Sequence, residues 1–247
     1  MPGYISKVLE RFAPHLCLGA ASPAVYIPPS YGAPTQTVTS DTSSVLPQSA
    51  IKRHQEQVGC LLHYARGADA TILPAVNHIA SLQSQPTVMV AAAMDRLLQY
   101  CARFPDNALV FTAYDMRLFI QSDASYLSRP KARSVAGGIF YLGNNNQPTT
   151  INDPCLTLSS IIPVIISSVA EVEFAAVFMN AKEGASLRDI LDILGYSQPT
   201  TDILCDNMCA VGLASDTVIP KKTKSIDMQF HWIRDRVRQK QFKVTWR

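Results

Sequence analysis

The sequence has no long hydrophobic run. None of its apolar stretches reaches the roughly 18 to 20 residues that a membrane span needs. Its first residues also lack the basic segment and apolar core of a secretory signal. These absences argue against a membrane span and against secretion. We therefore expect an intracellular protein with no membrane partner, and the choice between cytoplasm and nucleus stays open.

Cysteine is also sparse, which bears on both disulfides and zinc. Six cysteines are scattered over 247 residues, a density far below that of a secreted disulfide scaffold. Cys205 and Cys209 are four positions apart, but no further Cys or His pair lies near them at the spacing of a zinc finger. We therefore expect free, buried thiols and no zinc role for these two residues.

Charged residues are few, and their distribution says more than their total. They make up 17% of the chain against 47% hydrophobic residues, an ordinary composition for one or two globular domains with a buried core. The net charge is +3, yet the segment from Lys221 to Arg247 holds nine basic and two acidic residues, a local excess of +7. Such a segment attracts phosphate backbones. A solvated helix face is the alternative interpretation.

The first 107 residues divide into two regions by composition. Residues 1–46 begin with a short helical segment at 6–12 and then become rich in Pro, Ser, Thr and Gly, which predicts a mostly irregular tether. Residues 47–107 instead place apolar residues at helical spacing, which predicts a small helical module. Its expected helices cover 47–64, 70–82 and 87–104.

From residue 108 the periodicity changes to that of an α/β domain, which we expect to extend over residues 108–247. Short β-branched and aromatic runs predict strands, and longer apolar stripes predict helices. The expected strands are 108–112, 117–122, 135–142, 201–205 and 242–246, with a further strand edge at 155–159. The expected helices are 169–181, 186–194, 207–214 and 225–238. This order predicts an α/β fold with a mixed sheet flanked by helices.

Acidic residues at three places stand in settings that suit metal chemistry. Asp123 follows one short apolar run and Asp206 ends another, so both are expected at strand ends. In the helix between them, Glu171 and Glu173 lie on opposite edges of the apolar stripe, and periodicity does not choose between them. Carboxylates from strands and a helix are what a two-metal nuclease needs. Alternatively, Asp123 is a turn carboxylate, and Asp206 followed by Asn207 is a helix N-cap.

Four sequence blocks occur in an order typical of one known family. They are Gln121–Tyr126 with Lys131–Gly138, then Ser167–Phe174, Cys205–Asn207 and Lys222–Met228. Together they resemble the ribonuclease H domain of copia-type LTR retrotransposon polyproteins. Upstream, Val58–Ala65 and Arg96–Tyr100 resemble the connection that joins the reverse transcriptase to that domain. The resemblance therefore covers nearly the whole chain.

The resemblance implies a fold, a reaction and a site. The fold is ribonuclease H-like, and the reaction is hydrolysis of the RNA strand in an RNA·DNA hybrid. Two Mg²⁺ or Mn²⁺ ions would be held by Asp123, Glu173 and Asp206, so the resemblance selects Glu173 over Glu171. Asn207 would support the substrate. The basic residues expected to contact nucleic acid are Lys221, Lys222, Lys224, Arg234 and Arg238.

The family site also has a fourth acid, in a block that follows the last strand. Here the sequence ends at Arg247, so we expect that acid and the C-terminal helix of the domain to be missing. Two hypotheses follow: a ribonuclease H with weakened activity, and a noncatalytic remnant that keeps the fold and binds nucleic acid. The sequence has no polymerase, integrase or protease motif. Beside the hybrid, the expected partner is therefore the reverse transcriptase part of the same polyprotein type.

Overall fold

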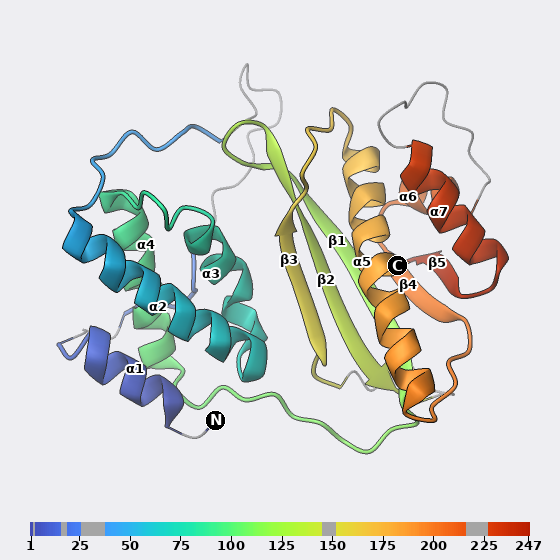
Figure 1. The fold of residues 1–247 in the computed structure, drawn as a ribbon, viewed down its shortest axis with the longest axis horizontal. Coiled ribbons are helices and arrows are strands. Elements are labelled where there is room, and N and C mark those ends of the chain that lie inside the picture. Colours follow the sequence, from blue (N-terminus) through green and yellow to red (C-terminus); the bar gives the residue numbers. More distant parts are fainter. Residues whose placement is uncertain (2, 16–18, 26–37, 145–151, 216–226) are drawn as a thin grey trace. The chain divides into compact units, whose positions relative to one another are not determined.

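The structure, a computed structural model, describes residues 1, 3–15, 19–25, 38–144, 152–215 and 227–247. Within these ranges the chain forms two compact units, Met1–Leu109 and Val110–Arg247, each with its own apolar core (Figure 1). No helix in the described ranges is both long enough and apolar enough to cross a membrane.

The first unit is a group of helices around one apolar core. Its elements are α1 (Tyr4–Phe12), α2 (Gln48–Gly67), the 3₁₀ helix η1 (Ala70–Ile72), α3 (Leu73–Ala80) and α4 (Val88–Arg103). Leu61 of α2, Val76 of α3 and Leu97 of α4 are fully buried in this core. The apolar stripes read from the sequence therefore face inward, as helical spacing predicts.

Helix α1 corresponds to the short helical segment predicted at 6–12, at the start of the region predicted to be a mostly irregular tether. Ile5, Val8 and Phe12 lie along one face of α1 and are buried in the same core as α2 and α4. Burial of these three side chains makes α1 part of the first unit. The Pro-rich residues follow this helix, and part of that stretch lies outside the described residues.

The second unit is built on a five-stranded mixed sheet. Its strands are β1 (Arg117–Arg129), β2 (Arg133–Gly143), β3 (Leu156–Ile161), β4 (Thr201–Cys205) and β5 (Phe242–Trp246). Their spatial order is β3-β2-β1-β4-β5. Strand β2 pairs antiparallel with β1 and β3, whereas β4 pairs parallel with β1 and β5. This confirms the predicted mixed sheet, with its strands in the ribonuclease H order.

One predicted strand is wrong, because residues 108–112 are not in the sheet and β3 completes it instead. The backbone N–H of Thr112 donates to the side-chain oxygen of Asn152 at 2.9 Å. The backbone N–H of Val110 donates to a carboxylate oxygen of Asp153. Side chains therefore satisfy donors that a strand would present to its neighbour.

Three helices pack against the sheet: α5 (Val169–Ile193), α6 (Met208–Ala214) and α7 (Asp227–Arg238). Helix α5 lies along β1 and β2, while α6 and α7 contact β5 and α5 (Figure 1). The sequence predicts two helices within α5, but one helix continues through Gly184. A Cβ at Gly184 would come within 2.5 Å of the Ile120 Cδ1 atom. The glycine therefore serves close packing of α5 on β1 and does not interrupt the helix.

Candidate functional site

The parallel strands of the sheet bring their carboxyl ends to one edge. Ser122 of β1 lies opposite Cys205 of β4, and Cys205 lies opposite Trp246 of β5. Asp123 directly follows Ser122, and Asp206 directly follows Cys205, so both lie at this edge. In open α/β sheets, ligands bind beyond the carboxyl ends of the strands where the connections diverge. The register therefore places both aspartates where a site is expected.

Asp123 does not lie at a strand end, contrary to the sequence prediction. Strand β1 continues beyond it, in antiparallel pairing with β2, as far as Arg129. The pairing of β1 with β4 stops at Ser122, however, so Asp123 lies just beyond the end of this shorter neighbour. Its side chain is exposed there. Asp123 thus has a mid-strand position with one side open.

Glu173 reaches the same edge from the second turn of α5. Its side chain is only 5% exposed. One carboxylate oxygen each of Glu173 and Asp206, together with the Cys205 sulfur, all lie within 4.8 Å of one another. Glu171, the alternative that periodicity leaves open, is partly exposed in the first turn of α5. The structure therefore brings Glu173 to Asp206, and Asp123 lies near enough to act on both electrostatically.

Asn180, two turns after Glu173, fixes α5 on the sheet. Its Nδ2 donates to the Ser122 hydroxyl at 2.9 Å and to the Gly137 carbonyl oxygen at 2.8 Å. Asn180 is fully buried, and a Cβ at Gly138 would overlap its side-chain oxygen. These contacts set the position of α5 against β1 and so hold Glu173 at the sheet edge.

The pKa values at this edge reflect crowded carboxylates. Burial first, and then the charges of Asp123 and Asp206, raise the pKa of Glu173 to about 8, and a hydrogen bond from the Ala124 N–H opposes this rise. The pKa of Asp123 is also raised, mainly because the protein packed on its inner side reduces its solvation. A hydrogen bond from the Ala124 N–H at 2.8 Å opposes that rise, and Asp206 adds to it. Like charges this close favour protonation unless a cation neutralises them.

The donor set fits a divalent cation. Oε2 of Glu173 is buried and has no hydrogen-bond partner among the residues that the structure describes. A buried polar atom without a partner costs about 1–3 kcal/mol, and a bound cation would offset this cost. Mg²⁺ and Mn²⁺ prefer carboxylate and water oxygens. Glu173 and Asp206 supply such oxygens together, and Asp123 supplies another beside them.

Sequence patterns do not reveal two features of this edge. Cys205 is a free, buried thiol, as expected, but its sulfur lies within the carboxylate cluster. Trp246 is 60% exposed, and its Nε1 donates to the carbonyl oxygen of Asp206 at 3.2 Å. An exposed indole offers a stacking surface for a nucleic-acid base. The only local signal was that Cys205 directly precedes Asp206, because the pairing that brings Trp246 there is long-range.

Asn207 has a structural role in this arrangement. It is the N-cap of α6, and its side-chain oxygen accepts hydrogen bonds from the N–H groups of Cys209 and Ala210 at 3.0 and 3.1 Å. The capping role considered for Asp206 therefore belongs to Asn207, and the Asp206 side chain is exposed at the site. Support of a substrate by Asn207 stays a prediction.

The basic residues expected to contact nucleic acid are only partly described. Lys221, Lys222 and Lys224 lie outside the residues that the structure describes. Arg234 is partly buried on α7, and its Nε donates to a backbone carbonyl oxygen of α6 at 3.0 Å. Arg238 is exposed at the end of α7. Of these five, Arg234 helps to pack α7 on α6, and Arg238 presents its side chain to solvent.

The chain is similar in sequence to retrovirus-related Pol polyproteins from plant transposons. The chain is 25% identical over 244 residues to the retrovirus-related Pol polyprotein from transposon TNT 1-94 of Nicotiana tabacum, covering 98% of this chain and 17% of that protein. It is 28% identical over 174 residues to that from transposon RE2 of Arabidopsis thaliana, covering 69% of this chain and 11% of the relative. The resemblance to retrotransposon polyproteins is thus confirmed over most of the chain, which spans about a sixth or less of these relatives.

Solved structures show a related fold. The foamy viral protease-reverse transcriptase, solved in complex with dsDNA, matches with a TM-score of 0.51 at 12% identity, covering 86% of this chain and 40% of that one. The N-terminal RNase H domain of rv2228c from Mycobacterium tuberculosis has a TM-score of 0.38 at 12% identity, covering 53% of this chain and 82% of that one. No protein-family model matches the chain. The first of these structures supports the fold and nothing finer.

Proposed function

We propose that this chain is a ribonuclease H-type endonuclease fragment of a retrotransposon polyprotein, which hydrolyses the RNA strand of RNA·DNA hybrids with divalent metal ions. The observation that carries the proposal is the buried Glu173 facing Asp206, with Asp123 beside them, at the carboxyl edge of a ribonuclease H-like sheet. The similarity to retrovirus-related Pol polyproteins supports the same class of function.

Three carboxylates have distinct positions in the proposed site. Glu173 is buried, Asp206 is exposed on the solvent side, and Asp123 lies beside the open end of the β1–β4 pair. Together they would hold two Mg²⁺ or Mn²⁺ ions, which when bound activate water and stabilise the leaving oxygen. Because Glu173 and Asp123 both have raised pKa values, their deprotonation and metal binding would be coupled.

The side chains around the carboxylates would position the hybrid. Trp246 presents an exposed indole, and Nη1 of Arg247 donates to the side-chain oxygen of Gln121 at 3.2 Å across the same edge. Arg238 adds an exposed cation on α7. A hybrid would be recognised through its A-form shape, its 2′-hydroxyls and its phosphates, with no sequence preference. Binding should therefore weaken strongly as salt is raised.

The first unit is proposed to have a different partner. The resemblance of residues 58–65 and 96–100 to the connection of such polyproteins supports contact with a reverse transcriptase part of the same polyprotein type. Similarity over 98% of this chain to a single Pol polyprotein supports a common origin for both units. The chain spans only 17% of that relative.

The test is cleavage of an end-labelled RNA·DNA hybrid in Mg²⁺ or Mn²⁺ by the full chain, compared with Asp206→Asn. We expect metal-dependent cleavage by the wild type and none by this variant. Asp235→Asn is the matched control, because Asp235 is an exposed aspartate on α7 that accepts a hydrogen bond from Gln239 at 2.7 Å. It should cleave like the wild type.

Two other outcomes would contradict the proposal. Wild-type cleavage no greater than that of Asp206→Asn would remove the nuclease function. Retained, salt-sensitive binding of the hybrid in that case would favour the noncatalytic alternative, a remnant that keeps the fold and binds nucleic acid. Equal loss of cleavage in Asp235→Asn would show that the loss does not report on the site.

A further inference from the structure

The Cys205 thiol lies in the carboxylate cluster but has no part in magnesium chemistry. Cys205 is the last residue of β4 and is 1% exposed. Its sulfur and one carboxylate oxygen each of Glu173 and Asp206 all lie within 4.8 Å of one another. Magnesium takes oxygen ligands, whereas thiolates select softer cations such as Zn²⁺. The sulfur therefore gives the cluster a ligand type that the proposed reaction does not need.

A second observation points to a ligand at the same place. Glu173 is 95% buried, and its Oε2 has no hydrogen-bond partner within the described part of the chain. Most buried polar side-chain atoms in proteins have a partner. A buried carboxylate with an unpartnered oxygen, close to a thiol and to a second carboxylate, is the arrangement that a cation would complete.

The geometry lies within reach of a zinc site. Tetrahedral zinc has Zn–S bonds of about 2.3 Å and Zn–O bonds of about 2.0–2.2 Å, which place ligand atoms about 3.4–3.6 Å apart. From 4.8 Å, the three atoms would need to approach one another by on the order of 1 Å. Asp206 is exposed and lies where β4 ends, so its side chain has room to move toward the other two ligands. The solvent side of Asp206 leaves a fourth position for water.

We propose that Glu173, Cys205 and Asp206 form a binding site for a thiophilic divalent cation, Zn²⁺, that overlaps the site for Mg²⁺. On binding, the sulfur forms a bond to the ion and its proton leaves to solvent, so no electron is transferred. The ion uses two of the carboxylates that would hold Mg²⁺. Zn²⁺ therefore excludes Mg²⁺ and inhibits cleavage, a consequence that rests on the proposed nuclease function, whereas the binding itself does not.

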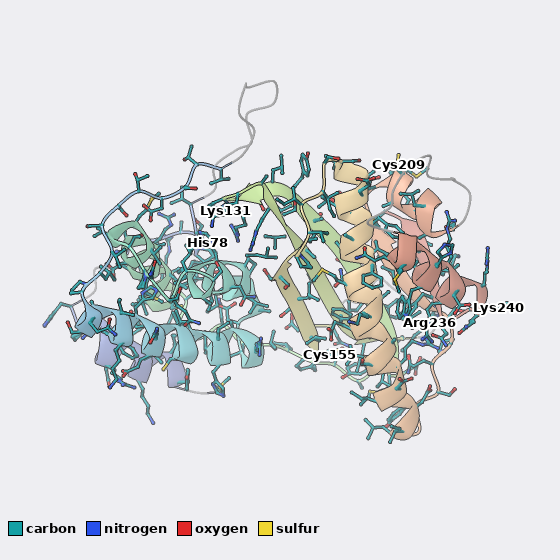
Figure 2. The ribbon with its side chains drawn as sticks, turned by 45° about the horizontal axis from the view of Figure 1, so that its top comes forward. His78, Lys131, Cys155, Cys209, Arg236 and Lys240 are labelled. Atoms are coloured by element: carbon teal, nitrogen blue, oxygen red, sulfur yellow. The ribbon has the colours of Figure 1, made fainter. Side chains whose placement is uncertain are left out.

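The binding test uses Cd²⁺ as the probe, because cadmium thiolates have a near-ultraviolet charge-transfer band. The full-length chain is titrated without metal or nucleic acid, beside Cys205→Ser and Cys205→Ala. Cys209→Ser is the matched control, since Cys209 is an exposed thiol four residues away on α6 (Figure 2). We expect the band in the wild type and in Cys209→Ser. Both Cys205 variants should lose it and bind Cd²⁺ at least about tenfold more weakly.

The outcomes separate the site from the function. Persistence of the full band in both Cys205 variants, or its loss in Cys209→Ser alone, would overturn the proposed site. Far-ultraviolet circular dichroism checks folding, and Ala is included in case the buried Ser hydroxyl perturbs β4. In the cleavage assay, half-inhibition of Cys205→Ala should need at least about tenfold more Zn²⁺ than that of the wild type. A Cd²⁺ band without any Mg²⁺-dependent cleavage would remove the nuclease proposal and leave the zinc site standing.

Discussion

Two carboxylates, one in each compact unit, are almost equally buried and differ in what surrounds them. Asp69, in the first unit, is 4% exposed and accepts hydrogen bonds from the Thr71 N–H at 3.1 Å, the Thr71 hydroxyl and the Asn107 amide at 2.9 Å. Glu173, in the second unit, is 5% exposed, and its Oε2 meets no hydrogen-bond donor in the described ranges. Burial alone thus does not mark a site. What sets Glu173 apart is a buried carboxylate oxygen that its own protein leaves without a partner, so substitutions of the two residues should have different consequences.

The largest expected effect is on cleavage. Glu173→Gln keeps the size of the side chain and removes its charge, so hybrid cleavage in Mg²⁺ should fall at least about a thousandfold, because the site loses a metal ligand. Glu171→Gln changes a partly exposed acid two residues earlier and should leave the rate within about twofold of wild type. Equal loss in both variants would mean that burial of Glu173 carries no functional information.

The next effect tests how α5 is held on the sheet. Gly138→Ala should lower the free energy of unfolding by about 3 kcal/mol or more, because the new Cβ overlaps the buried Asn180 side chain. Gly137→Ala is the matched control, since its Cβ would lie 3.6 Å from the nearest atom, an ordinary contact. It should cost about 1 kcal/mol or less. Denaturation in urea measures both, and similar midpoints would contradict the proposed role of Asn180.

Asp69, whose carboxylate accepts three hydrogen bonds, should contribute to stability and not to cleavage. Asp69→Ala removes the acceptor of three hydrogen bonds and should destabilise the first unit by about 2–3 kcal/mol, since the donors of Thr71 and Asn107 lose their partner. Asp69→Asn keeps one side-chain oxygen and should cost about half as much. Thermal unfolding of the whole chain checks this. If the chain cleaves hybrid, cleavage per folded molecule should be unchanged, and a specific loss of cleavage would break the contrast with Glu173.

The smallest effect is the pH dependence of stability without metal. The pKa of Glu173 is about 8 in the folded chain and lies near 4.5 in the unfolded chain. Between these values the folded state binds more protons, so the free energy of unfolding should fall as pH rises from about 4.5 to 8. Glu173→Gln should flatten this slope and be more stable than wild type above pH 8. If the free energy of unfolding of the two proteins changed with pH in parallel, the pKa of Glu173 would not be raised by burial and the neighbouring carboxylates.

The sequence predicts elements well where burial alternates locally. The bounds of β4 and β5 match those predicted, because Thr201, Ile203 and Cys205 alternate with less buried neighbours as the residues of a half-buried strand do. It fails where distant contacts decide the outcome. Helix α5 continues through Gly184 because the sheet lies close there, and residues 108–112 bind side chains 40 or more positions away.

The sequence predicts the acidic residues of the site but not the other side chains that lie beside them. Periodicity leaves Glu171 and Glu173 equivalent, because both border the apolar stripe and only the position of the sheet distinguishes them. The family resemblance selects Glu173 by motif alone and does not explain why this residue is buried at the sheet edge. Cys205 and Trp246 enter the site through the register of β4 with β5, which joins residues 41 positions apart in the chain. Such pairing is not encoded in any local pattern.

Binding of Mn²⁺ in the absence of nucleic acid shows whether Glu173 is a metal ligand without relying on cleavage. Calorimetric titration of the wild type, Glu173→Gln and Glu171→Gln compares the buried acid with its neighbour in the same helix. We expect Glu171→Gln to bind Mn²⁺ like the wild type, whereas Glu173→Gln should bind it at least about tenfold more weakly. Equal Mn²⁺ affinity in all three proteins would show that Glu173, with its buried unpartnered oxygen, holds no metal ion.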